Sequence, residues 1–236
     1  MNLALIITAA GSSTRFGAGC KKEYLPLTIS GNEGTVLSHC LDAFLKTSLF
    51  SYVVITIPQN HQENAKAALF KSCFYNELFT NTRFAFAFEA GGNSRQESVY
   101  CGLKKIEQMA AANNEMPDAV LIHDGARPWV DEEIINAVIE KLPLSGAAVT
   151  ALPATDTQKE VDASGKITKH LHREQIFAVQ TPQGFYLQPL LEAHKKAASD
   201  GCIYTDDTEI WGRYCGDVYI CKGSTQNKKI TYKEDL

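Results

Sequence analysis

The chain contains 236 residues, of which 44% are hydrophobic and 21% are charged, and its formal net charge is −4. This balance is typical of a globular domain and excludes disordered and collagen-like proteins. No apolar run approaches the roughly 18–20 residues that span a bilayer, no secretory leader is recognisable, and no basic block indicates nucleic-acid binding. The seven cysteines are odd in number and include no CxxC pair, which favours reduced thiols over zinc or disulfide sites. We therefore expect a cytoplasmic protein without a membrane or nucleic-acid partner.

Short apolar or β-branched segments alternate with stretches of helical spacing as far as Leu152. The predicted strands are Leu3–Ile7, Tyr52–Ile57, Phe84–Phe88, Ala119–Ile122 and Ala147–Leu152. The predicted helices are residues 36–45, 61–72, 94–109 and 131–142, with caps at Thr35, at Asp131 and at Ser94, which forms a capping-box pattern with Glu97. This alternation predicts a single Rossmann-like α/β domain over residues 1–236, with a mostly parallel sheet and helices on both faces.

Residues 155–172 interrupt the alternation with a polar segment. Asp162-Ala163-Ser164-Gly165 has the composition of a turn between two short alternating runs, which is typical of a β-hairpin. A two-stranded hairpin with weak hydrophobic faces is only marginally stable alone, so we expect this inserted arm to pack against a partner subunit. The alternative is a surface loop without fixed structure.

A loop of small residues follows the first predicted strand. It reads Ala9-Ala10-Gly11-Ser12-Ser13-Thr14-Arg15, and Lys21 and Lys22 come soon after. Small residues at the carboxyl end of a strand let backbone N–H groups approach phosphate oxygens, and Arg15 and Lys22 would add positive charge. The spacing matches neither the Walker A loop nor GxGxxG. A simple connection between strand and helix is the alternative interpretation.

The segment His123-Asp124-Gly125-Ala126-Arg127-Pro128 ends another predicted strand. Ligands of open α/β sheets bind at this carboxyl edge, and an Asp there suits Mg²⁺ held between the protein and phosphates. The alternative for Asp124 is a helix cap, but Asp131 is better placed for that role. We expect His123 to be packed or hydrogen-bonded rather than a metal ligand.

Two other segments are weak indicators when taken alone. Gly91-Gly92-Asn93 precedes the helix capped by Ser94 and offers a close backbone approach to a ligand, although a helix start alone explains it. Asn227–Thr231 is a strand-like run with a lysine pair, a pattern that usually belongs to solvated surface.

In chain order, these segments together resemble the 2-C-methyl-D-erythritol 4-phosphate cytidylyltransferases. The resemblance covers essentially the whole chain and is carried by these motifs: Ala9-Ala10-Gly11 with Arg15 and Lys22-Glu23-Tyr24; Gly91-Gly92-x-x-Arg95-x-x-Ser98; His123-Asp124-x-Ala126-Arg127-Pro128; Asp156-Thr157; Thr181-Pro182-Gln183; Thr205-Asp206; Lys229-Ile230-Thr231; and Glu234-Asp235-Leu236. The resemblance implies a nucleotidyltransferase that transfers CMP from CTP to 2-C-methyl-D-erythritol 4-phosphate, with release of pyrophosphate, in non-mevalonate isoprenoid precursor synthesis. Glu23 stands where Gln is commoner in the family, which places a carboxylate beside Lys22.

The resemblance also implies roles for single residues. The cationic groups that offset the charge of the reacting phosphates are Arg15, Lys22 and Lys229, with Mg²⁺ or another divalent cation. The CTP phosphates are cradled by Ala9, Ala10 and Gly11, and the cytosine and ribose are held by Gly92, Asn93, Ser98 and Gly125. Asp124 binds the metal and lies beside the methylerythritol group. The other residues on the substrate side are Arg127, Thr157, Arg173 and Thr181, of which Arg173 and Thr181 grip the substrate phosphate from the other subunit of a homodimer, through the hairpin arm.

Two alternatives remain open at this point. Ribitol 5-phosphate cytidylyltransferases share these motifs, although their first loop more often has Gly-Gly where this chain has Ala9-Ala10. A nucleotide-binding regulator without catalytic activity belongs to a different class, and it would be favoured by the loss of a charged site residue. Arg15, Lys22, Asp124 and Lys229 are all present in the sequence.

Overall fold

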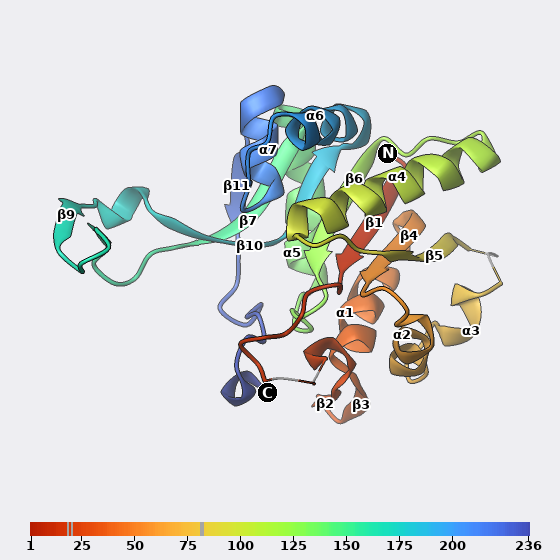
Figure 1. Ribbon diagram of the computed structural model, residues 1–236. Coiled ribbons are helices and arrows are strands. Elements are labelled where there is room, and N and C mark those ends of the chain that lie inside the picture. Colours follow the sequence, from red (N-terminus) through yellow and green to blue (C-terminus); the bar gives the residue numbers. More distant parts are fainter. Residues whose placement is uncertain (18, 20, 81–82) are drawn as a thin grey trace.

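The computed structural model describes residues 1–17, 19, 21–80 and 83–236, and Cys20 lies outside these residues (Figure 1). Strands in this part of the chain form a seven-stranded sheet. They are β1 (Leu3–Thr8), β4 (Phe50–Ile57), β5 (Ala85–Ala90), β6 (Ala119–Asp124), β7 (Ala147–Pro153), β10 (Phe177–Tyr186) and β11 (Tyr219–Lys222). The strand order is β11-β7-β10-β6-β1-β4-β5. Among the described strands of this sheet, only β10 runs antiparallel to its neighbours, so the expected mostly parallel sheet is confirmed.

Helices cover both faces of this sheet. One face carries α1 (Val36–Leu45), α2 (Gln62–Leu69) and α5 (Glu132–Lys141), and the other carries α4 (Arg95–Asn113), α6 (Leu187–Ser199) and α7 (Asp207–Tyr214). The alternation of side chains along β1 explains the two layers, because Leu3, Leu5 and Ile7 belong to the first core, whereas Ala4 and Ile6 belong to the second. The predicted α/β architecture with helices on both faces is therefore confirmed.

The shorter elements lie around this central sheet. They are β2 (Pro26–Ile29) and β3 (Asn32–Thr35), which pair as a hairpin, α3 (Tyr75–Leu78), and the 3₁₀ turns η1 (Lys22–Tyr24), η2 (Leu142–Leu144), η3 (Arg173–Gln175) and η4 (Lys233–Asp235). None of the helices in the described ranges is long and apolar enough to span a membrane.

Side chains cap the three helices at the predicted positions. Thr35 and Ser38 form a reciprocal capping box, and Asp131 accepts a hydrogen bond from the Ile134 N–H. Ser94 accepts from the Glu97 N–H at 3.0 Å, as expected. The Glu97 carboxylate, however, accepts from the N–H of residue 93 rather than from that of Ser94, so the predicted reciprocal box is displaced by one residue.

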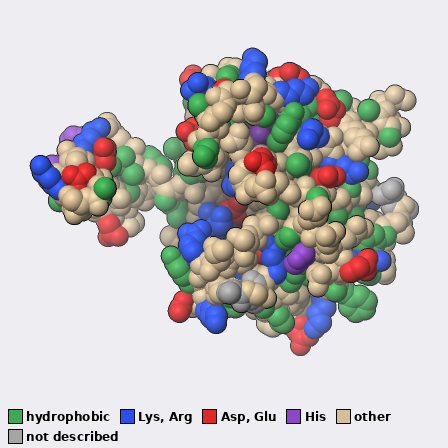
Figure 2. All heavy atoms as spheres, viewed as in Figure 1, with side chains coloured by type: hydrophobic (Ala, Val, Ile, Leu, Met, Phe, Trp, Pro, Cys, Tyr) green, Lys and Arg blue, Asp and Glu red, His purple; other side chains and the backbone are tan. Residues whose placement is uncertain are grey.

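The segment between β7 and β10 leaves the sheet and forms an arm. Strands β8 (Lys159–Val161) and β9 (Ile167–His170) pair antiparallel, and the Asp162 carboxylate accepts from the Ser164 and Lys166 N–H groups in the turn between them. All residues of both strands are exposed. The arm stands apart from the main body of the chain in Figures 1 and 2, so intramolecular packing provides little support for it.

The topology brings two loops together at the carboxyl edge of the sheet. β1 pairs with β4 on one side and with β6 on the other, so the order of the strands reverses at β1. The last residues of β1 and β6, Thr8 and Asp124, are direct neighbours in this pairing. The loops that follow them therefore border one crevice, which is the place where open α/β sheets bind ligands.

Candidate active site

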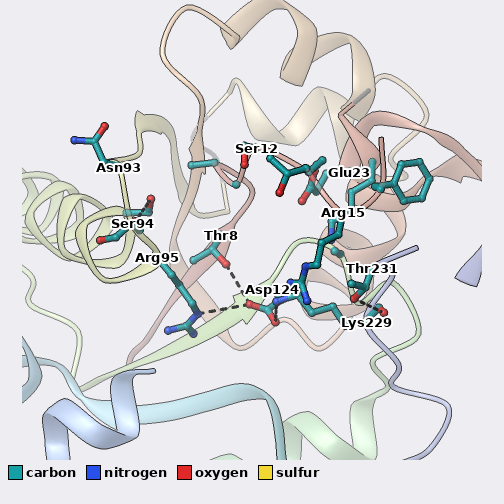
Figure 3. Close-up of a pocket in the computed structure, with 18 of the residues that line it drawn as sticks. Thr8, Ser12, Arg15, Glu23, Asn93, Ser94, Arg95, Asp124, Lys229 and Thr231 are labelled. Carbon is teal, nitrogen blue, oxygen red and sulfur yellow. Dashed lines mark hydrogen bonds and ion pairs between the residues drawn. The ribbon is translucent and has the colours of Figure 1, made fainter. Parts of the chain in front are cut away.

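A cavity of about 480 Å³ opens at this edge of the sheet. Its walls come from the loop after β1, from the turn before α4, from the end of β6 and from residues near the carboxyl end of the chain (Figure 3). Of the residues expected at the site, Ala10, Gly11, Arg15, Lys22, Gly92, Asn93, Ser98, Asp124 and Lys229 line this cavity. The other expected residues lie outside its lining: Ala9, Gly125, Arg127, Thr157, Arg173 and Thr181.

Asp124 lies among cationic groups at the floor of the cavity. Its Oδ2 is 2.9 Å from Lys229 Nζ and 3.4 Å from Arg127 Nε, and its Oδ1 is 3.7 Å from Arg95 Nε. Figure 3 shows Arg95 and Lys229 approaching this carboxylate from different sides. Burial would raise the pKa of Asp124, but Lys229, Arg95 and Arg127 hold it well below its ordinary value. The carboxylate is therefore ionised at neutral pH.

The oxygens around Asp124 fit a magnesium ion that is held mainly by a ligand's phosphates. Within the described residues, no group of three or more His, Cys, Asp or Glu side chains could hold a metal. Mg²⁺, however, commonly uses one or two carboxylates and completes its shell with phosphate oxygens and water. Asp124 Oδ1 lies 3.5 Å from the Thr8 hydroxyl and 3.7 Å from Arg95 Nε. Both contacts are long, so this carboxylate oxygen is available to such an ion.

The lysines beyond the first loop have separate roles in the structure. Lys21 Nζ donates to the Gly11 carbonyl and forms an ion pair with Glu23 at 3.1 Å, whereas Glu23 also accepts from the Ser13 hydroxyl at 3.4 Å. The carboxylate of Glu23 is thus paired with Lys21. Lys22 Nζ lies 2.5 Å from the Ile230 carbonyl, and burial lowers its pKa. This contact joins the first loop to the carboxyl-terminal residues.

The Gly91–Gly92 turn comes into close contact with the elements around it. A Cβ atom on Gly91 would lie 2.3 Å from the Cβ of Ala10, and one on Gly92 would lie 2.3 Å from the Cβ of Glu97. Only glycine fits at such distances. The turn therefore brings the backbone beside Asn93 to the cavity, and it leaves the residue 93 N–H within reach of Glu97.

Thr181 does not lie on the arm, contrary to the expectation that it acts from the other subunit. It follows the arm within β10, where it lies beside Asp124, and its side chain is only 3% exposed. Its hydroxyl accepts from the Asp124 N–H at 3.0 Å and is 3.1 Å from Nδ1 of His123. Thr181 is thus bound inside its own chain, where it satisfies the backbone of Asp124.

The hydrogen bonds of His123 fix the positions of its protons. His123 Nε2 is 3.1 Å from the Arg127 carbonyl, which can only accept, so Nε2 carries the proton and Nδ1 accepts from Thr181. Burial lowers the pKa of His123 to about 4, which keeps the ring neutral. The expectation of a hydrogen-bonded histidine rather than a metal ligand agrees with this arrangement.

Three of the expected residues lie next to the cavity without lining it: Arg127, Gly125 and Ala9. Arg127 donates to the Asn227 carbonyl at 2.8 Å as well as contacting Asp124. The Gly125 N–H donates to the Thr8 carbonyl, and the Ala9 N–H donates to the Thr56 carbonyl. Because these N–H groups are already bonded within the protein, Gly125 and Ala9 do not offer them to a ligand.

Thr157 and Arg173 are exposed and belong to the arm region, away from the cavity of their own chain. Arg173 donates to the Thr155 carbonyl at 3.3 Å and lies 3.7 Å from Glu174. At the other end of the chain, the strand-like run Asn227–Thr231 forms a loop rather than a strand. Its Lys229 reaches the cavity, whereas Lys228 lies over the ring of Trp129.

Asp207 is a buried charged residue beside the cavity to which the sequence motifs assign no role. Arg95 lines the cavity and its Nη1 is 2.6 Å from the carboxylate of Asp207, which is fully buried at the start of α7 and also contacts His194. In the sequence, Asp206-Asp207 resembles a helix cap followed by an acidic first turn, and Asp206 does cap α7. Nothing in that pattern indicates a partner as distant in sequence as Arg95.

Comparisons with known proteins point to one family. The family model described as IspD, 2-C-methyl-D-erythritol 4-phosphate cytidylyltransferase, matches residues 3–236. The proteins of that name from Bacillus cytotoxicus and Acidobacterium capsulatum are each 35% identical to this chain, over 98% and 100% of its length and 93% and 95% of theirs.

Solved structures agree with this result. The 4-diphosphocytidyl-2C-methyl-D-erythritol synthase of Anaerococcus prevotii has a TM-score of 0.77 and 26% identity, and it covers 99% of this chain and 94% of its own. The 2-C-methyl-D-erythritol 4-phosphate cytidylyltransferase of Francisella tularensis has a TM-score of 0.76 and 27% identity, with coverage of 100% and 96%. With a model match over nearly the whole length and relatives at 35% identity, this chain belongs to the 2-C-methyl-D-erythritol 4-phosphate cytidylyltransferase family.

Proposed function

We propose that this protein transfers CMP from CTP to 2-C-methyl-D-erythritol 4-phosphate, forming 4-diphosphocytidyl-2-C-methyl-D-erythritol and pyrophosphate in non-mevalonate isoprenoid precursor synthesis. One observation carries the proposal. The cavity at the carboxyl edge of the sheet is lined by the cationic residues Arg15, Lys22, Arg95 and Lys229 and by two acidic residues, of which Glu23 is paired with Lys21 and Asp124 contacts Lys229. That charge distribution suits two phosphate-bearing substrates and one divalent cation.

The chemistry is a direct displacement that needs no covalent enzyme intermediate. An oxygen of the substrate phosphate attacks the α-phosphorus of CTP, and the bond from that phosphorus to the bridging oxygen of the β-phosphate breaks, so that pyrophosphate leaves. The protein has to bring two anions together and stabilise the charge that grows at the α-phosphate. We assign this work to Arg15, Lys22 and Lys229, all of which line the cavity.

Asp124 Oδ1 is the oxygen that we assign to Mg²⁺ or another divalent cation. When bound, the cation supplies positive charge to the triphosphate and polarises its phosphorus–oxygen bonds. Lys229 and Arg127 orient the carboxylate through its other oxygen. Thr181 helps to position Asp124 by accepting a hydrogen bond from its backbone N–H.

The Gly91–Gly92 turn and the start of α4 form the part of the cavity that we assign to cytosine and ribose. This part is lined by Gly92, Asn93 and Ser98. Because the two glycines of the turn have no side chains, their backbone can come close to a ligand. Ala10 and Gly11 line the neighbouring wall, which suits the phosphates. The Ala9 and Gly125 N–H groups bond within the protein, so they are left out of this assignment.

The proposal includes a homodimer in which the arm of one subunit reaches the substrate side of the other. Thr157 and Arg173 are exposed on the arm region of this chain and are far from its own cavity lining, so a role in catalysis requires a second subunit. The proposal also includes a cytoplasmic location, for which the free thiols of the described cysteines are the support.

The test is pyrophosphate release with CTP and Mg²⁺, run in parallel on 2-C-methyl-D-erythritol 4-phosphate and ribitol 5-phosphate. We expect turnover on the first substrate only. The relatives and structures named above all carry methylerythritol names, so they do not favour the ribitol alternative. Turnover on ribitol 5-phosphate alone would refute the substrate assignment but keep the CTP site. Binding of CTP without turnover of either substrate would favour a regulator.

A further inference from the structure

Arg95 lies between two carboxylates that come from different elements. Its Nη1 is 2.6 Å from Oδ2 of Asp207, whereas its Nε is 3.7 Å from Oδ1 of Asp124. The first distance is that of a strong, charge-assisted hydrogen bond, and the second is that of a loose ion pair. Arg95 therefore binds Asp207 closely and associates only loosely with Asp124. Figure 3 marks the contact with Asp124 by a dashed line.

Asp207 has a second partner on its other carboxylate oxygen. Its carboxylate is fully buried, and its Oδ1 accepts from His194 Nε2 at 3.1 Å. The ring of Tyr100 stacks on His194 with a centroid distance of 6.0 Å. Burial would raise the pKa of Asp207, but Arg95 and His194 lower it, so the group is ionised. A buried charge with partners fixed on both sides holds Arg95 in one orientation.

The two oxygens of Asp124 are used unequally. Oδ2 contacts Lys229 at 2.9 Å and Arg127 at 3.4 Å. Among the described residues, Oδ1 has only the long contacts with Thr8 and Arg95. Arg95 Nη2 has no hydrogen-bond partner in the described ranges, so the guanidinium has a donor to spare for a second carboxylate.

We propose that Asp207, braced by His194, is a positioning residue that holds Arg95 away from Oδ1 of Asp124 and so keeps that oxygen available to a divalent cation. This inference rests on the magnesium site proposed above and concerns its regulation by a neighbouring charge. Without the Asp207 carboxylate, the nearest anionic partner of Arg95 is Asp124, and the local charge rises by one unit. Both changes oppose cation binding, whereas the added positive charge favours an anionic nucleotide that carries no metal.

The test compares the wild-type protein with Asp207→Asn in two binding measurements. Mn²⁺ binding to the complex with CTP is followed by water-proton relaxation, which distinguishes Mn²⁺ held by the protein complex from Mn²⁺ on free CTP. We expect Asp207→Asn to weaken Mn²⁺ binding by about tenfold or more, as is common for residues that orient metal ligands. CTP binding in EDTA, measured by calorimetry, is expected to stay equal or to become tighter.

Two further variants separate positioning from damage to the fold. Asp42→Asn removes another buried carboxylate, which accepts from Ser72 and from the Cys73 N–H, so it controls for lost stability, and we expect its Mn²⁺ binding to match the wild type. The double variant Asp207→Asn with Arg95→Gln removes the competing cation as well, and we expect it to regain most of the lost Mn²⁺ affinity. His194→Phe keeps both charges of the pair but removes the brace, and we expect a smaller loss in the same direction.

The outcomes distinguish this inference from the proposal on which it rests. Equal Mn²⁺ affinity in the wild type and Asp207→Asn would overturn the inference alone. A parallel loss of Mn²⁺ and metal-free CTP binding that Arg95→Gln does not rescue would also overturn it, because that pattern describes a disrupted fold. Failure of the wild-type complex with CTP to bind Mn²⁺ would overturn both the inference and the assignment of the cation to Asp124.

Discussion

At the scale of single residues, Lys22 combines a structural contact with a role in charge stabilisation. Its ammonium group contacts the Ile230 carbonyl and faces the cavity beside Arg15. We expect Lys22→Ala to lower kcat by about 10²–10³-fold, with a much smaller rise in the KM for CTP, because the charge on the α-phosphate grows in the transition state. Steady-state pyrophosphate release measures both constants. Lys228→Ala is the matched control, since Lys228 lies over Trp129 outside the cavity lining. An unchanged kcat with weaker CTP binding would mean that Lys22 serves ground-state binding only.

Thr181 is expected to act through Asp124. In Thr181→Val the shape of the side chain is kept, but the Asp124 N–H and His123 Nδ1 lose their partner. Leaving buried polar groups unsatisfied costs about 1–3 kcal/mol, so the free energy of unfolding in urea is expected to fall by that amount, together with kcat. Thr181→Ser keeps the hydroxyl and is expected to restore most of both quantities. Normal stability and activity in Thr181→Val would contradict the role assigned to this hydroxyl.

His123 makes the stability of the fold sensitive to acid. The unfolded chain protonates this side chain near its ordinary pKa of about 6.5, whereas the native pKa is lowered to about 4 by burial. The unfolded state therefore binds more protons between these values, and the free energy of unfolding is expected to decrease from pH 6.5 to pH 4, by about 3 kcal/mol for this group. Urea unfolding at pH 7 and at pH 4.5 measures the change. His123→Gln keeps a donor for the Arg127 carbonyl and should flatten this dependence; an equal slope in both proteins would contradict the assignment.

The sequence indicated the residues that face the cavity better than the residues behind them. Lys22, Asp124 and Lys229 belong to short motifs in a recognisable order, and all of them line the cavity. Thr181 and Arg127 belong to the same motifs, but their roles depend on partners that lie 57 and 100 residues away, respectively. A motif specifies which residue types are needed, whereas the packing of the folded chain decides which of them face the ligand.

At the scale of elements, the start of α4 links helix stability to the shape of the cavity. Ser94 caps the helix by accepting from the Glu97 N–H, and Glu97 in turn holds the N–H of residue 93. We expect Ser94→Ala to lower the free energy of unfolding by about 1 kcal/mol and to raise the KM for CTP, because the Gly91–Gly92 turn loses its anchor. Ser94→Asp retains a capping oxygen and is expected to keep the stability. Thermal unfolding measures the change in stability, and steady-state kinetics measure the KM for CTP. A normal KM in Ser94→Ala would mean that the helix cap does not affect CTP binding.

Periodicity predicted the strands of the central sheet up to β7 well, but it missed the β2–β3 hairpin, α3 and the elements after the arm. The predicted strands and capped helices follow the alternation of apolar and polar residues, and burial enforces that pattern. β10 carries Thr181-Pro182-Gln183 in its middle, and its register shifts between Val179 and Gln183. Polar residues and a proline usually argue against a central strand, so β10 can be recognised only from its tertiary contacts. Similarly, helix 61–72 was predicted to continue past Leu69, where α2 ends.

At the scale of the whole molecule, the arm explains why a second subunit belongs to the proposal. Val161 and Ile167 are cross-strand partners on the arm, and they are 54% and 47% exposed. We expect Val161→Asp with Ile167→Asp to convert a dimer into a monomer in light scattering after size exclusion. The monomer should bind CTP but lose turnover, because Thr157 and Arg173 would no longer reach another subunit. Lys169→Ala, on the same strand, is the control. A double variant that stays dimeric, or a monomer with full turnover, would contradict this role of the arm.

The contacts of the last ten residues have a practical consequence for protein engineering. The Ile230 side chain is fully buried beside Phe16, its N–H donates to the Ala126 carbonyl, and its own carbonyl contacts Lys22. Leu236, by contrast, is half exposed. Substitutions at Leu236 are therefore expected to be tolerated more readily than substitutions at Ile230. A deletion that extends back to Ile230 would remove a wall of the cavity and release the loop at the opposite end of the chain.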